Sequence, residues 1–272
     1  MSSLFLNIML GEEWHNRCVA LNNKPDPWML NGNLAWLTAH PVADPDMRRL
    51  NYEQRVIRLS DALFTLVGKV AGFERLRQRF LARNNTRASF AEAEIASLLV
   101  HNGCSVQIIG ETGVRGQDFD LLVTVQGVSI SVEVTSIQSG ILSVRAIFNK
   151  LNDKRDQVPK NRPAVLYILV PESWMKNYQA AFLAFTEAIT RFVRTSRRIN
   201  IFVLVWESMK EAPGGGTLHR SLQPVFSKRP RWSIPDRAFL TLNRDKWGQS
   251  RYSRSFLDAI RTLRIRQQIE QS

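Results

Sequence analysis

The sequence predicts an α/β protein in which a mixed sheet is flanked by helices. Short runs of β-branched and apolar residues alternate with longer segments whose apolar residues recur at helical spacing. Two of the short runs, residues 164–170 and 199–206, are apolar along almost their whole length, with Asn200 the exception, which is typical of buried strands. From residue 90 onward the expected order is helix, three strands, helix, strand, helix, strand.

Residues 1–85 are expected to form a helical N-terminal region. Proline-rich segments before residue 46 interrupt any helix there, because proline lacks the backbone N–H donor. From Met47 to Arg83 the apolar residues recur every three or four positions, with possible breaks at Gly68 and Gly72. This pattern predicts two or more helices.

Residues 86–210 are expected to form the strand-rich core. Ser89 followed three residues later by Glu92 is a capping-box signature, so we expect a helix from Phe90 to His101 that ends at Asn102-Gly103. Three β-type runs follow, and a tight turn at Gln126-Gly127 makes the last two a hairpin. The expected strands cover residues 105–109, 119–125 and 128–137, and the later helices cover residues 141–157 and 174–195.

Residues 211–272 are expected to form a basic C-terminal extension. Pro213 and the three glycines after it predict a flexible joint, and further prolines discourage regular structure until a last helix at residues 252–268. Trp232 and Trp247 lie among arginines and lysines. Such aromatic residues either stack on bases or pack in a core, and the sequence leaves both roles open.

Composition and charge narrow the classes of function. Lys and Arg number 37 against 24 Asp and Glu, and a net charge of +13 favours a polyanionic partner, with nucleic acid the leading candidate. Hydrophobic residues make up 44% and charged residues 22%, which is the composition of a globular chain and excludes disorder. Two cysteines suit a reducing compartment, so we expect a cytoplasmic protein. The chain begins without a signal-peptide pattern and contains no apolar run of about 20 residues, so no membrane step is expected.

The predicted hairpin brings acidic residues onto one face of the sheet. Side chains alternate along a strand, so Asp118 and Asp120 share a face and Glu133 lies on the matching face of the next strand. Carboxylates that are brought together repel each other unless a cation lies between them. Hard oxygen ligands of this kind suit Mg²⁺ or Mn²⁺, so the pattern predicts a metal site.

The stretches EAEIASLLVHNGCSV and GQDFDLLVTVQGVSISVEVT resemble the core of the PD-(D/E)XK, or restriction-endonuclease-like, nuclease superfamily. Their spacing is similar to that of archaeal-type Holliday junction resolvases. Glu92 matches the glutamate of the first core helix, Asp120 the motif aspartate and Glu133 the motif glutamate. The resemblance covers about residues 89–170. It implies a restriction-endonuclease-like αβββαβ core and a metal-dependent endonuclease that hydrolyses DNA phosphodiester bonds in repair, recombination, restriction or defence.

One position departs from the family pattern. The family has a lysine two residues after the motif glutamate, where this sequence has Thr135, which carries no positive charge. In some members of the superfamily the lysine is relocated to the following helix. Here Lys150, Lys154 and Gln157 lie on one face of that helix, because they are spaced by four and three residues. Lys154 is the preferred substitute.

The resemblance then implies a role for each candidate. The metal is held by Asp120, Glu133 and the Val134 carbonyl, and Glu92 helps directly or through water. Lys154 orients the site or neutralises charge. The candidates for a supporting role are Asp118, Thr135, Lys150 and Gln157.

Each candidate residue also has a structural explanation. Glu92 alone is explained as the partner in a capping box, Asp118 and Asp120 as turn residues, and Lys154 as a solvated helix residue. Because of Thr135, the first alternative function is a catalytically inactive nucleic-acid-binding protein with the same fold. A second alternative is a partner-binding protein whose basic charge serves protein contacts. The sequence leaves open whether the chain forms a homodimer.

Overall fold

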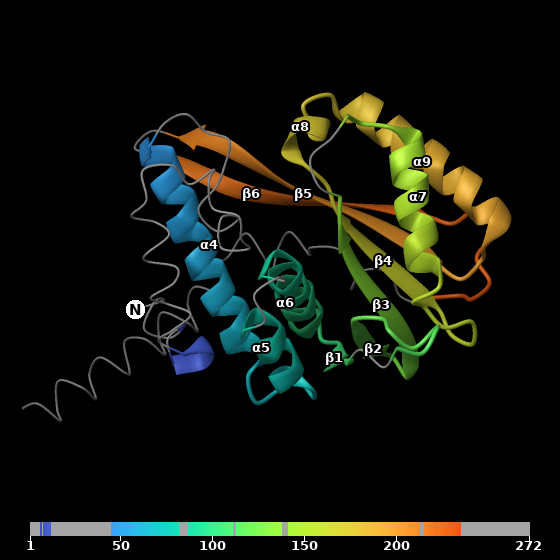
Figure 1. The fold of residues 1–272 in the computed structure, drawn as a ribbon, viewed down its shortest axis with the longest axis horizontal. Helices are drawn as coiled ribbons and strands as arrows, with labels where there is room; N and C mark the ends of the chain where they lie inside the picture. The colour runs from blue at the N-terminus through green and yellow to red at the C-terminus, as the bar shows by residue number, and fades with distance from the viewer. Residues whose placement is uncertain are drawn as a thin grey trace, which may run out of the picture.

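The computed structural model describes residues 6, 8–11, 45–81, 86–110, 113–137, 141–212 and 215–234. These residues form an α/β fold in which helices cover both faces of one mixed sheet (Figure 1). The predicted α/β class is therefore confirmed. Within the described residues, no helix has both the length and the apolar composition needed to cross a bilayer.

The sheet contains six strands, in the same order in space as along the chain. The first three strands and the last two pair antiparallel, whereas β3, β4 and β5 pair parallel. Parallel neighbours require a crossover connection, which the helices between them provide. The strands are β1 (Ser105–Ile108), β2 (Leu121–Val125), β3 (Val128–Ser136), β4 (Ala164–Leu169), β5 (Ile201–Ala212) and β6 (Gly215–Phe226).

Two layers of helices bury the two faces of the sheet. Side chains of β4 alternate between the layers: Tyr167 lies in one hydrophobic core and Leu166 in the other. The first layer contains α4 (Pro45–Leu66), α5 (Phe73–Leu81) and α6 (Thr86–His101). The second layer contains α7 (Val144–Arg155), α8 (Glu172–Met175) and α9 (Tyr178–Thr195).

The hairpin formed by β2 and β3 has the predicted turn. Gln126 and Gly127 have φ angles of 49° and 78°, as a two-residue turn with the twist of a hairpin requires. The register pairs Leu122 with Ser131 and Leu121 with Val132. Both faces of the hairpin contain buried residues: Val132 lies in the same hydrophobic core as Tyr167, and Ser131 and Glu133 are buried on the opposite face.

The start of α6 differs from the prediction. The helix begins at Thr86, so Ser89 lies inside it, fully buried, and does not cap its first turn. The residues before Ser89 contain no glycine or proline that would stop a helix from extending in that direction. The capping-box explanation for Glu92 is therefore wrong.

The expectation of irregular structure after Glu211 is also wrong for the residues up to Phe226, which belong to strands β5 and β6 where the structure describes them. Strand β5 continues across the expected domain boundary at residue 210 and pairs with β6. Pro224 is tolerated in β6, opposite Val203, because β6 is an edge strand and one side of its backbone needs no partner. The expected last helix and Trp247 lie outside the described residues.

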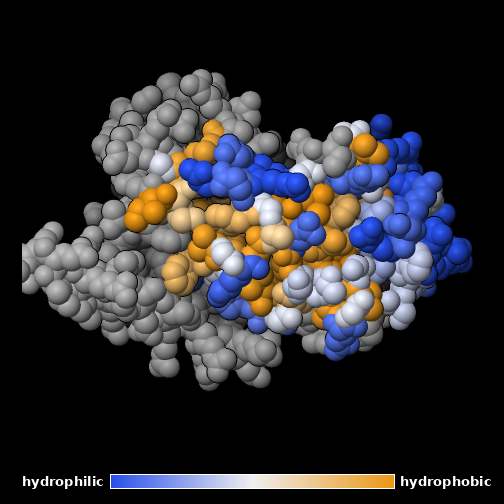
Figure 2. Space-filling view, turned by 90° about the horizontal axis from the view of Figure 1, so that it is seen from below, coloured by the Kyte–Doolittle hydropathy of each residue, from blue (hydrophilic) through white to orange (hydrophobic). Residues whose placement is uncertain are grey.

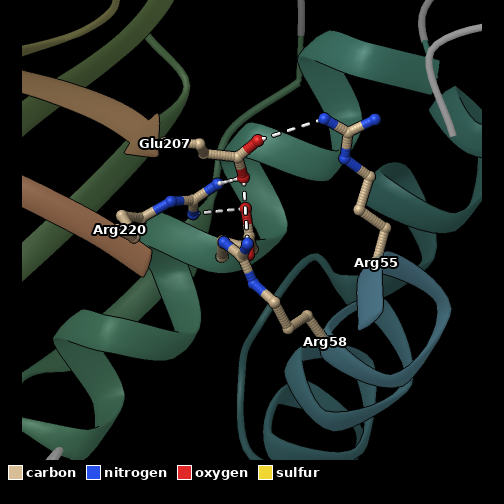
Figure 3. A network of polar contacts seen from close by, with 5 residues as sticks. Arg55, Arg58, Glu207 and Arg220 are labelled. Carbon is tan, nitrogen blue, oxygen red and sulfur yellow. Dashed lines mark hydrogen bonds and ion pairs between the residues drawn. The ribbon is translucent and has the colours of Figure 1, made fainter. Parts of the chain in front are cut away.

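A buried network of ion pairs joins helix α4 to the rest of the fold (Figure 3). Glu207 on β5 accepts from Arg58 at 2.9 Å, Arg220 at 2.8 Å and Arg55 at 3.3 Å. Burial alone would raise the pKa of Glu207, but the three arginines lower it far below its ordinary value. Glu94 on α6 pairs with Arg58 and Arg220, so the network connects α4, α6, β5 and β6.

Candidate functional site

A cavity of about 730 Å³ opens where α6, the hairpin of β2 and β3, and α7 meet. All nine residues that the sequence analysis singled out line it. The fold thus brings residues that are up to 65 positions apart in the sequence together in one cavity. The nine are Glu92, Asp118, Asp120, Glu133, Val134, Thr135, Lys150, Lys154 and Gln157.

The two acids of the hairpin lie opposite each other. The pairing of Leu121 with Val132, extended by one residue, places Asp120 across from Glu133. Asp120 Oδ2 accepts a hydrogen bond from the Val134 backbone N–H at 2.7 Å, so its side chain is fixed against β3. The Glu133 side chain is 2% exposed. The hairpin register therefore sets the geometry of this acidic pair.

Lys154 reaches the acidic pair from α7. Its Nζ donates to Glu133 Oε1 at 2.6 Å and to Gln157 Oε1 at 2.7 Å. Burial would lower the pKa of Lys154, but the nearby carboxylates, Glu133 first, raise it above its ordinary value. The ammonium group therefore stays charged. It supplies beside Glu133 the positive charge that the neutral side chain of Thr135 lacks.

A second cation, which the sequence analysis missed, comes from the N-terminal helices. Arg79 on α5 forms an ion pair with Glu92, and its Nη1 lies 3.7 Å from Asp120 Oδ1. Its other terminal nitrogen donates to the Ile109 carbonyl at 2.7 Å, which fixes the guanidinium between α6 and β1. No spacing pattern marks Arg79 in the sequence, because the contact joins separate helices.

Burial raises the pKa values of three of the carboxyls that line the cavity, those of Glu92, Asp120 and Glu133. Burial, followed by the charge of Asp120, raises the pKa of Glu92 to about 8. Burial also raises the pKa of Asp120 and, together with the charge of Asp120, raises that of Glu133 well above its ordinary value. Glu133 Oε2 is buried and has no hydrogen-bond partner among the described residues. The cavity thus contains an oxygen that is open to a further cation.

Asp120 and Glu133 are the residues of the cavity that could hold a hard divalent cation. In the described part of the chain, no group of three or more His, Cys, Asp or Glu side chains is arranged to hold a metal ion. Glu92 is engaged by Arg79, which leaves two carboxylates, one with the unpartnered Oε2. Carboxylate and carbonyl oxygens together with water are the ligands that Mg²⁺ and Mn²⁺ accept.

The supporting candidates have different surroundings. Asp118 Oδ1 accepts from the Gly113 backbone N–H at 3.0 Å, so this side chain helps to close the loop before β2. Gln157 holds the ammonium of Lys154. Thr135 and Lys150 line the cavity, and Thr135 is buried.

Comparison with known proteins does not assign a function to this cavity. No family model matches the chain, and no curated protein or solved structure matches it.

Proposed function

We propose that the chain is a nuclease that depends on Mg²⁺ or Mn²⁺ and hydrolyses DNA phosphodiester bonds with a restriction-endonuclease-like core. The observation that carries the proposal is the 2.6 Å contact between Lys154 Nζ and Glu133 Oε1 beside Asp120. Two acids and a lysine are the groups that the PD-(D/E)XK pattern requires, with the lysine here supplied by α7. The antiparallel hairpin followed by a parallel crossover to β4 is compatible with such a core.

Each residue has a proposed role. Asp120, Glu133 and the Val134 carbonyl would hold the metal, and Glu92 would contact it through water because Arg79 engages its carboxylate. A bound divalent ion supplies acidity to a water ligand and compensates charge on the phosphate. Lys154 holds Glu133 in place and carries the positive charge that faces the substrate phosphate.

The composition supports the choice of substrate and compartment. A net charge of +13 favours a polyanion, and three buried carboxyls in a basic chain suit a site where a cation and a phosphate meet. The proposal places the protein in the cytoplasm, where its two cysteines would stay reduced.

A catalytically inactive DNA-binding protein with the same fold is the alternative function. Thr135 is neutral, and the two cations of the cavity already engage Glu133 and Glu92. In this alternative the ion pairs only stabilise the fold, and DNA binds without being cut.

The test is cleavage of supercoiled and linear DNA in the presence of Mg²⁺ or Mn²⁺. Asp120→Asn, Glu133→Gln and Lys154→Met are each expected to lower the cleavage rate by on the order of 100-fold or more, because each removes a charge at the reacting phosphate. Asp153→Asn and Lys176→Met are matched controls, since both residues are exposed and neither lines the cavity.

Three outcomes separate the possibilities. Loss of cutting in the three cavity variants and full activity in both controls supports the nuclease with its relocated lysine. Cutting that survives Lys154→Met but not the acid substitutions keeps the nuclease and removes that lysine from the proposal. Salt-sensitive DNA binding without cutting by the wild type, with either metal, favours the inactive binder.

A further inference from the structure

Two adjoining hollows of about 810 and 360 Å³ lie beside the cavity and form one continuous groove. They share Arg115, Lys160 and Arg198 in their walls. We call this feature the basic groove and define it by Arg115, Lys160, Arg162, Arg197, Arg198 and Arg231. These residues come from the loop before β2, the connection from α7 to β4, the end of α9 and the segment after β6.

The groove carries a large excess of positive charge. Among its described lining residues, Asp156 is the only carboxylate. Asp156 accepts from Arg115 at 2.6 Å and from Arg198 at 3.2 Å, and hydrogen bonding to Arg115 lowers its pKa. Figure 2 shows strongly hydrophilic residues gathered on its right side, the side on which α9 ends in Figure 1. Among the described lining residues, no second carboxylate is present to balance Lys160, Arg162, Arg197 and Arg231.

The walls of the groove continue into the walls of the cavity. In the loop before β2, Gly113 and Asp118 line the cavity, whereas Arg115 lines the groove. At the end of α7, Gln157 lines the cavity, and the residues that follow it line the groove. The Gly116 backbone N–H donates to the Asp156 carbonyl at 2.7 Å and ties these two walls together. The groove and the acidic cavity are therefore lined by adjoining residues of the same two segments.

We propose that the basic groove binds the phosphodiester backbone of the nucleic acid whose reacting bond enters the cavity. Guanidinium groups bind phosphates through paired N–H donors, and each neutralised phosphate releases counterions. The Arg231 guanidinium stacks 5.6 Å from the centre of the Trp232 ring, which limits its freedom and orients its charge. The statement that a reacting bond enters the cavity rests on the proposed function, whereas the statement that the groove binds the backbone does not.

The experiment compares two double variants that change the net charge equally. Lys160→Glu/Arg197→Glu reverses two exposed cations of the groove, and Lys69→Glu/Lys176→Glu reverses two exposed lysines elsewhere. Binding is measured by fluorescence anisotropy with a labelled DNA duplex, in EDTA to prevent cutting and over a range of salt concentrations. Circular dichroism verifies that each variant is folded.

The groove variant is expected to bind about 30-fold more weakly at about 0.15 M salt, because each lost phosphate contact removes about 5-fold in affinity there. The slope of log affinity against log salt is expected to become shallower by about 1.8. The control variant should stay within about 3-fold of the wild type, since its charges lie away from the groove.

Equal weakening of both double variants would overturn the inference, because net charge alone would then explain binding. Unchanged affinity of the groove variant, or no duplex binding by the wild type, would overturn it as well. Groove-dependent binding by a wild type that cuts no DNA supports the groove and rejects the nuclease. If the wild type cuts DNA in a manner that depends on Asp120, but the groove variant binds the duplex as tightly as the wild type, the result supports the nuclease and rejects the groove.

Discussion

Glu92 is expected to make the fold lose stability as the pH rises, and Glu92→Gln is expected to make that loss smaller. The pKa of Glu92 rises from 4.5 to about 8 on folding. Between these values the unfolded chain has released a proton that the folded chain retains, so the free energy of unfolding falls as the pH increases. The slope is about 1.4 kcal/mol per pH unit, and the total is at most about 5 kcal/mol because Asp120 titrates together with Glu92.

Urea unfolding at a series of pH values, from about 5 to about 9 and without divalent metal, measures this effect. The stability of the wild type should decrease across the series, whereas that of Glu92→Gln should decrease less steeply, because Asp120 and Glu133 still titrate in the variant. Glu187→Gln is the control, since Glu187 is exposed on α9 away from the cavity. Parallel curves for the wild type and Glu92→Gln, after the control has matched the wild type, would refute the reasoning from burial and Asp120.

Further predictions address the metal, the glycines and the ion-pair network. Mg²⁺ is expected to raise the Tm of the wild type, and Asp120→Asn is expected to abolish that rise in differential scanning fluorimetry. Gly72→Ala should cost several kcal/mol in urea unfolding, on the order of 3, because a Cβ there would lie 2.3 Å from the Ile108 carbonyl oxygen. Gly68→Ala should cost only about 1–2 kcal/mol, since φ is +70° but no atom lies within 4 Å. Glu207→Gln should cost about 3–5 kcal/mol, because it leaves buried arginines without their carboxylate. The wild type should keep this contribution in full at pH values above 4.5 and lose it progressively as the pH falls below that value toward the lowered pKa, as measured by urea unfolding in acid.

The acidic pair and its lysine could be predicted because their geometry follows from local rules. The Gln126-Gly127 turn fixes the hairpin register, and the alternation of side chains then places Asp120 across from Glu133. Lys154 follows from helical spacing, once a crossover helix returns over the same face of the sheet. Each step depends on residues that are close in sequence, or on a connection whose handedness is fixed.

Arg79 could not be predicted, because its role depends on how two helices pack. Arg75, Arg77 and Arg79 occupy similar sequence surroundings on α5, and only the packing of α5 beside α6 and β1 selects the last of them. The strand β6 escaped prediction for a related reason. Whether Pro224 is acceptable in a strand depends on that strand lying at the edge of the sheet, which is a property of the whole fold.

The two buried ionic clusters of this chain have opposite charge balances, and the difference bears on function. In the network around Glu207, three arginines face two glutamates, so the pKa of Glu207 falls and the ion pairs hold helices and strands together. In the cavity, burial raises the pKa values of Glu92, Asp120 and Glu133 although Arg79 and Lys154 lie beside them, and the charge of Asp120 raises those of Glu92 and Glu133 further. A purely structural cluster would gain from replacing one of those acids with a neutral residue, since uncompensated buried charge destabilises a fold. A cation from solution would compensate these acids beside the partly open cavity, as the proposed metal site requires.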